Sequence, residues 1–145
     1  MLKNLDCLLS PDLLHALRAM GHGDEIAIVD ANFPAVANAR RLIRLDGVSA
    51  IAALDAVLSV MPLDDFVDCA AFRMSVVGAP DTEVPIYGEF RQCLARHEAG
   101  RAAALGALDR TAFYLRARNA FAIVATTEAR LYGNILLVKG VIRPQ

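Results

Sequence analysis

The sequence predicts an α/β domain whose central sheet is covered on both faces. Short, almost wholly apolar runs at 25–30, 121–125 and 135–139 have the length and composition of strands that are buried on both sides. Capped helical patterns stand between these runs. Hydrophobic residues make up 56% of the chain, so we expect a doubly covered sheet, additional subunit contacts, or both. The 145 residues are expected to form one domain, 1–145.

The first half of the chain is expected to alternate helices and strands. Serines that can cap helices open the helical patterns at 10–20 and 49–61, and a glycine or proline follows each pattern. The strand at 25–30 lies between these two helices. Residues 35–47 are expected to form a short helix and then a strand, ending in an Asp-Gly turn.

The second half is expected to continue this alternation. A buried strand is predicted at 69–77, although an arginine interrupts it. A helix that ends near residue 98 should follow, with Asp81 or Thr82 as its cap. We interpret the Ala- and Gly-rich residues 99–108 as a linker and Asp109 as the cap of the next helix.

The charge balance excludes several classes of partner. Fifteen basic and 16 acidic residues give a net charge of −1, so electrostatics do not favour nucleic acid or an anionic membrane. The longest apolar stretch, near 48–63, is interrupted by Asp55 and Pro62 and is too short to span a membrane. No signal-peptide pattern opens the chain. A neutral small molecule is the ligand class that fits best.

The cysteines and histidines give no metal or disulfide pattern. Cys7, Cys69 and Cys93 are odd in number and far apart, which indicates reduced thiols in a cytoplasmic protein. We expect no zinc site, because the histidines do not fall at metal-ligand spacings with one another or with the cysteines. The glycines form neither a GxGxxG nor a Walker loop, so no nucleotide cofactor is expected. The histidines are His15, His22 and His97.

Two titratable residues flank the strand at 25–30. His22 lies between two glycines before the strand, and Asp30 lies at its carboxyl end, where α/β proteins place ligand sites. The alternative is that Gly-His-Gly is only a loop and that Asp30 only caps a helix. Six extended residues span on the order of 20 Å. A shared site would therefore need a neighbouring subunit, or a fold-back of the glycine turn, to bring the two side chains together.

Polar residues with a capacity to bind sugars appear near the carboxyl terminus. Arg110, Tyr114 and Arg118 share one helix face, although spacing alone favours arginines that simply lie in water. Residues 132–134, Tyr-Gly-Asn, form a polar turn. Its ring can stack on a sugar, its amide can bind hydroxyls, and its glycine permits close backbone approach.

Several motifs in one order resemble the family of L-fucose mutarotases and D-ribose pyranases. They include Gly-His-Gly-Asp-Glu at 21–25, Asn-Phe-Pro at 32–34, Ala-Phe-Tyr at 112–114 and Tyr-Gly-Asn at 132–134. The resemblance runs nearly end to end, is weaker over the middle, roughly 35–107, and is closer to the fucose branch.

The resemblance implies a three-layer α/β/α sandwich with a mostly parallel central sheet. It also implies homo-oligomeric rings, commonly decamers built of pentamers and in some members dimers, with sites at subunit boundaries. The implied activity is cofactor-independent interconversion of monosaccharide anomers, with D-ribose pyranase activity or a non-catalytic sugar-binding module as alternatives. In the implied site, His22 is catalytic, Asp30, Arg110, Tyr132, Gly133 and Asn134 bind substrate, and Tyr114 is a candidate second proton carrier.

The chain departs from the family pattern at one position beside this implied site. It has Thr126-Thr127-Glu128 where relatives often have Thr-Gly-Glu. A β-branched residue replaces a flexible one just before the Tyr-Gly-Asn turn, so a change in loop geometry or sugar preference is expected.

Overall fold

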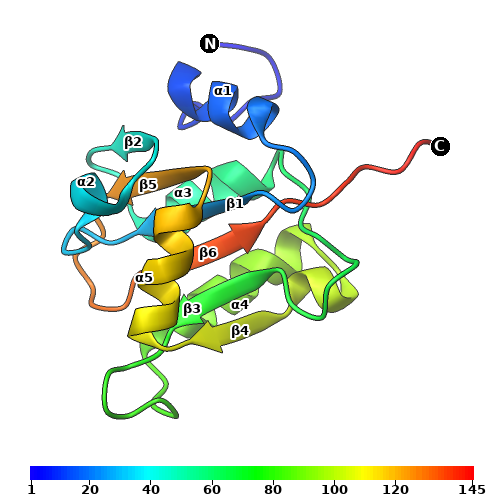
Figure 1. Ribbon diagram of the computed structural model, residues 1–145. Coiled ribbons are helices and arrows are strands. Elements are labelled where there is room, and N and C mark those ends of the chain that lie inside the picture. Colours follow the sequence, from blue (N-terminus) through cyan, green and yellow to red (C-terminus); the bar gives the residue numbers. More distant parts are fainter.

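The computed structural model describes all 145 residues and contains a six-stranded sheet between layers of helices (Figure 1). The strand order is β2-β5-β1-β6-β3-β4. Only β6 runs antiparallel to its neighbours, β1 and β3, which confirms the expected mostly parallel α/β sheet. The strands are β1 (Glu25–Val29), β2 (Leu42–Leu45), β3 (Ala71–Met74), β4 (Leu105–Leu108), β5 (Ala122–Thr126) and β6 (Ile135–Val138).

Helices cover both faces of this sheet. In Figure 1, α5 crosses the near face, while α3 and α4 lie behind the sheet. The helices are α1 (Pro11–Ala19), α2 (Ala35–Asn38), α3 (Ala50–Leu58), α4 (Pro85–His97) and α5 (Arg110–Asn119), with a short 3-10 helix, η1, at Gly100–Ala103. None of these helices combines the length and apolar composition needed to cross a membrane.

Three helix starts follow from side-chain caps that the sequence predicts. The side chains of Ser10, Ser49 and Asp109 accept hydrogen bonds from backbone N–H groups in the first turns of α1, α3 and α5. Each cap satisfies a donor that the helix itself cannot pair, which typically stabilises a helix by about 1 kcal/mol.

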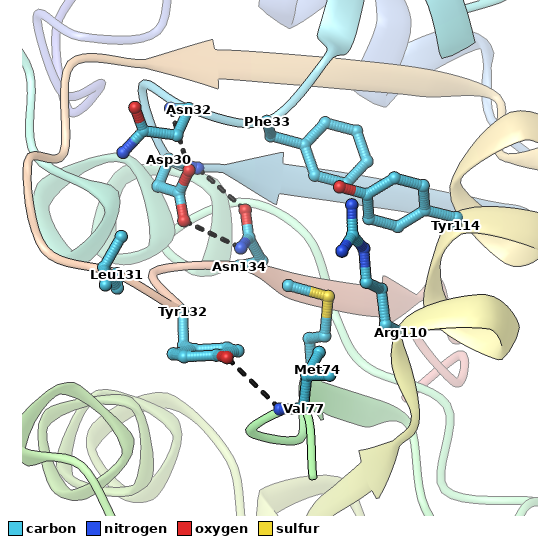
Figure 2. Close-up of a pocket in the computed structure, with 10 residues that line it drawn as sticks. All are labelled: Asp30, Asn32, Phe33, Met74, Val77, Arg110, Tyr114, Leu131, Tyr132 and Asn134. Atoms are coloured by element: carbon cyan, nitrogen blue, oxygen red, sulfur yellow. Dashed lines mark hydrogen bonds between the residues drawn. The ribbon is translucent and has the colours of Figure 1, made fainter.

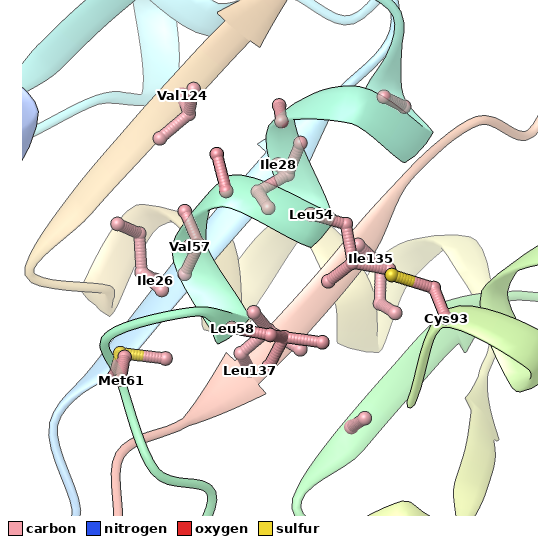
Figure 3. Packing of buried hydrophobic residues seen from close by; sticks show 14 of the residues in the cluster. Ile26, Ile28, Leu54, Val57, Leu58, Met61, Cys93, Val124, Ile135 and Leu137 are labelled. Carbon is pink, nitrogen blue, oxygen red and sulfur yellow. The ribbon is translucent and has the colours of Figure 1, made fainter. Parts of the chain in front are cut away.

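The two faces of the sheet bury cores of different size. Side chains alternate along a strand, so Ile26 and Ile28 of β1 belong to a 30-residue cluster with α1, α3 and α4 (Figure 3). Ala27 and Val29 belong to a cluster of ten residues beneath α2 and α5. The larger core contributes most of the buried apolar contacts of the sheet, and the pocket described below opens over the smaller one.

Residues 99–108 are not a linker, contrary to the sequence interpretation. They form η1 and the edge strand β4, which pairs in parallel with β3. A Cβ at Gly106 would lie 2.8 Å from Cys69 Sγ and 2.8 Å from Phe72, so the glycine permits the close approach of β4. Glycine and alanine have low strand propensity, so residues 105–108 become a strand because they pair with β3 and not because of their own preference.

The predicted start of α4 is also wrong. Neither Asp81 nor Thr82 caps this helix, which begins at Pro85 with Val84 as the flanking residue. Proline suits the first helical position because its missing N–H would have no partner there. Residues 78–84 instead form the loop that follows β3.

Candidate functional site

A cavity of about 240 Å³ opens beside the carboxyl end of β1 (Figure 2). Pockets for drug-sized ligands measure about 300–1,000 Å³, so this cavity suits a smaller molecule. Its position follows the rule that α/β sheets bind ligands beyond the carboxyl ends of their strands. The lining includes five residues singled out from the sequence, Asp30, Arg110, Tyr114, Tyr132 and Asn134, and also Phe33, Met74, Val77 and Leu131.

Asp30 and Asn134 form a buried pair at the base of this pocket. Asn134 Nδ2 donates to Asp30 Oδ2 at 2.8 Å, and the Asp30 backbone N–H donates to Asn134 Oδ1 at 2.9 Å. The Asn32 N–H donates to the other carboxylate oxygen at 2.9 Å. Each carboxylate oxygen keeps a further lone pair for a hydroxyl donor. The pair therefore presents hydrogen-bonding groups in a fixed orientation.

The turn that carries Tyr132 requires an unusual backbone. Tyr132 has φ of 63°, in the left-handed region that few non-glycine residues adopt. Its hydroxyl oxygen accepts the Val77 N–H at 3.2 Å (Figure 2). A Cβ at Gly133 would lie 2.7 Å from Glu128 Cγ and 3.3 Å from Asp30 Cβ. Glycine is therefore needed at position 133, where the turn presses against the Asp30 strand end.

Glu128 and Arg130 hold the residues that lead into this turn through hydrogen bonds to each other. The sequence analysis did not predict this role. The buried Glu128 carboxylate accepts hydrogen bonds from the Arg130 backbone N–H at 3.1 Å and from Arg130 Nε at 2.9 Å. It also accepts the Ala50 N–H at the start of α3. Hydrogen bonds from Arg130 lower the pKa of Glu128, although burial opposes them. Glu89 holds the other side of the Arg130 guanidinium.

Thr127 fits its loop without backbone strain. Its φ lies outside the left-handed region, and its backbone N–H donates to the Val48 carbonyl at 3.0 Å. Its hydroxyl donates to the same carbonyl at 3.3 Å, and its side chain is exposed. A glycine is therefore not required at position 127 by the backbone of this chain, and the expected effect on loop geometry or sugar preference stays a prediction.

Aromatic rings and Arg110 form a second wall of the pocket. The Tyr114 ring lies 4.8 Å from the Phe33 ring, and the Arg110 guanidinium carbon lies 5.2 Å from the Tyr114 ring. Figure 2 shows no hydrogen bond from Arg110 to the other residues drawn, so its donors remain available. Arg118, which shares their helix face, is exposed and does not line the pocket.

His22 lies at the opposite end of β1 and does not line this pocket. Its imidazole Nε2 is 3.2 Å from Asp64 Oδ1, and its ring centre is 5.4 Å from that of Phe66. The His22 side chain is 46% exposed, whereas that of Asp64 is 5% exposed. The expectation that His22 and Asp30 do not meet within one chain is therefore confirmed.

Asp64 is the second residue that the sequence analysis missed. Its backbone N–H donates to the Val138 carbonyl, and its neighbour Leu63 forms a β-bridge with Lys139. These long-range contacts bring position 64 beside the His22 turn, and no local pattern encodes them. The result is a half-exposed imidazole whose Nε2 lies 3.2 Å from a buried carboxylate, a pairing suited to proton transfer.

The expectation that no histidine lies at a metal-ligand spacing from a cysteine is wrong. Cys93 and His97 are four residues apart on α4, so they share one face of the helix, contrary to the expectation for the histidines and cysteines. Asp55 of α3 joins them, and the potential ligand atoms of the three residues lie within 4.8 Å of one another. This cluster lies in the α3–α4 layer, away from the pocket.

Known proteins are similar to this chain in both sequence and fold. Residues 3–142 match the RbsD / FucU transport protein family. The chain is 44% identical to the Homo sapiens fucose mutarotase, over 97% of this chain and 94% of that protein. It is 45% identical to the Streptococcus pneumoniae fucose mutarotase, whose crystal structure is in complex with L-fucose. That structural comparison has a TM-score of 0.90 and covers 98% of this chain and 100% of the other.

A more distant solved structure has the same fold. Bacillus subtilis RbsD, complexed with D-ribose, has a TM-score of 0.76 at 20% identity, over 99% of this chain and 100% of that one. At this identity the likeness concerns the fold alone. The family match and the two closer relatives both extend over nearly the whole sequence, and the chain therefore belongs to the RbsD / FucU family.

Proposed function

We propose that this chain is a mutarotase that interconverts the α and β anomers of L-fucose. The observation that carries the proposal is a small pocket whose neutral and charged hydrogen-bonding groups are held in place beside aromatic rings. This lining suits the hydroxyls and apolar faces of a monosaccharide. Two relatives, 44% and 45% identical over nearly the full chain, are named fucose mutarotases and support the choice of reaction and sugar.

The proposed reaction consists of two proton transfers in each direction. Ring opening removes a proton from the anomeric hydroxyl and delivers one to the ring oxygen, and closure on the other face of the carbonyl reverses these steps. We assign one of the two transfers to His22, because a histidine side chain can act as either acid or base near neutral pH. Asp64 occupies the Nε2 side of the ring, which leaves Nδ1 for the sugar. Such catalysis typically accelerates a reaction by about 10²–10⁴-fold.

The pocket residues hold the sugar while the proton moves. Asp30 accepts hydroxyl protons, Asn134 both donates and accepts, and the ring of Tyr132 offers an apolar face. Arg110 binds hydroxyls or stabilises negative charge that develops on oxygen. Tyr114 carries the second proton in this scheme. No step of the proposal requires a metal ion or a cofactor.

The proposed site is completed by a neighbouring copy of the chain. His22 lies across a five-residue strand from Asp30, a span of about 17 Å. We infer that a partner in a homo-oligomeric ring supplies His22 to the pocket. A decamer built of pentamers is the assembly we propose, with a dimer as the smaller form that could share sites in the same way. We also propose a cytoplasmic location, where free monosaccharides are metabolised.

Saturation-transfer NMR with L-fucose and D-ribose tests this proposal. We expect protein-dependent exchange between the α and β anomeric signals of L-fucose, above the spontaneous rate. Exchange confined to the pyranose and furanose forms of D-ribose would identify a pyranase instead. Sugar binding without accelerated exchange would identify a non-catalytic binding module and would contradict the proposal.

A further inference from the structure

A cluster of three potential metal ligands joins α3 to α4 on the face of the sheet opposite the pocket. Asp55 Oδ1 lies 2.8 Å from His97 Nε2 and 3.6 Å from Cys93 Sγ. Cys93 is fully buried, and its sulfur points toward Leu54 and Ile135 in the core (Figure 3) while it keeps the contact with Asp55. The side chains of Asp55 and His97 are 44% and 22% exposed, which leaves a route for an ion and for water.

Two distances in the cluster can be compared with those of a tetrahedral zinc site, and the third pair, Cys93 Sγ and the His97 ring nitrogen, lies within 4.8 Å. Bonds of about 2.3 Å to sulfur and about 2.0–2.2 Å to nitrogen and oxygen place the ligand atoms about 3.4–3.6 Å apart. The Cys93–Asp55 distance of 3.6 Å already matches. The His97–Asp55 distance of 2.8 Å, now a hydrogen bond, would need to open by roughly 0.6 Å. Small rotations of two partly exposed side chains can provide this change.

The types of the three ligand atoms favour zinc over other common divalent ions. One thiolate, one imidazole and one carboxylate match the mixed sulfur, nitrogen and oxygen sets that bind zinc, whereas magnesium and calcium prefer oxygen alone. Hydrogen bonds from His97 and Arg96 lower the pKa of Asp55 to about 2, so its carboxylate is ionised at neutral pH. Burial raises the pKa of Cys93 to about 11, so a bound ion must displace the thiol proton.

Arg96 is the group that competes with a cation here. Its Nη2 donates to Asp55 Oδ1 at 2.9 Å, but its side chain is 57% exposed. An exposed ion pair of this kind contributes little to stability, so the guanidinium can move into solvent or to the other carboxylate oxygen. No other cationic side chain forms an ion pair with Asp55 apart from His97.

We propose that Asp55, Cys93 and His97 bind a zinc ion, with water as the fourth ligand. Binding forms a sulfur–zinc bond as the Cys93 thiol proton passes to water. His97 Nε2 releases to water the proton that it donates to Asp55, Nδ1 takes up a proton from water, and the neutral ring binds the ion through Nε2. The ion would link α3 and α4, which pack on the sheet through the larger hydrophobic core. Its expected effect is on the stability of the α3–α4 layer, because the sugar pocket lies on the other face.

Cobalt titration of the metal-free, full-length protein tests the site. Co²⁺ takes zinc sites and produces a near-ultraviolet charge-transfer absorption when a thiolate binds it. We expect this absorption at one equivalent, its loss on adding Zn²⁺, and a zinc-dependent rise in melting temperature. Cys93→Ser should abolish the absorption, and His97→Gln should weaken binding by roughly tenfold or more.

Cys69→Ser is the matched control, since this partly buried thiol lies outside the cluster and should leave the cobalt absorption unchanged. Because His97 is partly exposed, His97→Gln is expected to fold even if the buried substitution Cys93→Ser does not. It then provides the test of the site by itself. The proposal is overturned if wild-type protein gives no thiolate absorption. It is equally overturned if the absorption survives in Cys93→Ser or if binding is unchanged in His97→Gln.

Discussion

The two ends of β1 present functional groups in opposite ways. At the carboxyl end, Asp30 and Asn134 are 5% and 2% exposed and hold each other through two hydrogen bonds. At the amino end, the His22 side chain is 46% exposed and contacts Asp64 and Phe66 from a surface turn. One end is a buried pair held in a fixed orientation, and the other is an accessible imidazole; in the proposed mechanism they bind the sugar and carry the proton.

This difference indicates how the proposed work is divided. Groups that bind hydroxyls are most effective when the fold orients them in advance, and burial among hydrogen-bond partners achieves this. A proton carrier must instead reach the sugar and exchange its proton, so it needs exposure. A single chain keeps the two functions a strand's length apart, and assembly with a partner is therefore part of the proposed site. The following substitutions separate the two ends.

His22→Ala should have the largest effect. Removal of the proton carrier should slow anomer exchange of L-fucose by about 10²–10⁴-fold, while folding is retained because the side chain is half exposed. Saturation-transfer NMR measures the rate, and circular dichroism checks the fold. His15→Ala, at an exposed position of α1, is the matched control and should exchange at the wild-type rate. Unchanged exchange in His22→Ala would remove this residue from the mechanism.

Gly133→Ala should damage the binding end alone. The added Cβ would lie 2.7 Å from Glu128 Cγ, so the turn must shift and displace Tyr132 and Asn134. A displacement of about 1 Å can cost about 10²-fold in kcat/KM. Gly88→Ala is the control, because a Cβ there meets nothing within 4 Å and alanine is the better helix former. Full activity in Gly133→Ala would mean that the turn geometry is not needed.

Glu128→Gln should act mainly on stability and on its dependence on pH. Loss of charge-assisted bonds to Arg130 should reduce the free energy of unfolding by about 1–3 kcal/mol. The folded-state pKa of Glu128 lies below its usual 4.5, so its contribution is complete above that pH and is lost as the pH falls further. Urea unfolding should therefore show a gap between wild type and variant that narrows below about pH 4.5. A gap independent of pH would contradict this role.

Tyr114→Phe should have the smallest effect. The ring can stay 4.8 Å from Phe33, so stability should change by less than about 0.5 kcal/mol. Loss of the hydroxyl should lower the exchange rate by about tenfold, comparable to one hydrogen bond. Exchange kinetics against pH measure the change. A wild-type rate and pH profile would assign the second proton to another group.

The sequence predicts those features of the fold that depend on local chemistry. Ser10, Ser49 and Asp109 cap helices as expected, because a cap involves only a few neighbouring residues. Strand β4 was missed because its alanine and glycine residues have little strand propensity, and the Gly106 side-chain position is filled by Cys69 and Phe72 from a distant segment. Pairing with β3 overrides the local preference there.

The candidate site divides in the same way. Asp30, Tyr132 and Asn134 stand out because each follows or precedes an apolar strand at a turn. Asp64 does not stand out, since it meets His22 only through a bridge between distant segments. Glu128 was missed as an anchor for a similar reason, because its bond to Ala50 joins residues 78 positions apart.

Complementation between two inactive variants tests the shared site most directly. His22→Ala and Asp30→Ala each disable one end of β1, and both should be inactive alone. When the two chains are co-expressed and assemble at random, about a quarter of the sites should combine an intact His22 with an intact Asp30 from a partner. Recovery of about a quarter of the wild-type L-fucose exchange is the predicted result. A mixed assembly that stays inactive would contradict a site built from two copies of the chain.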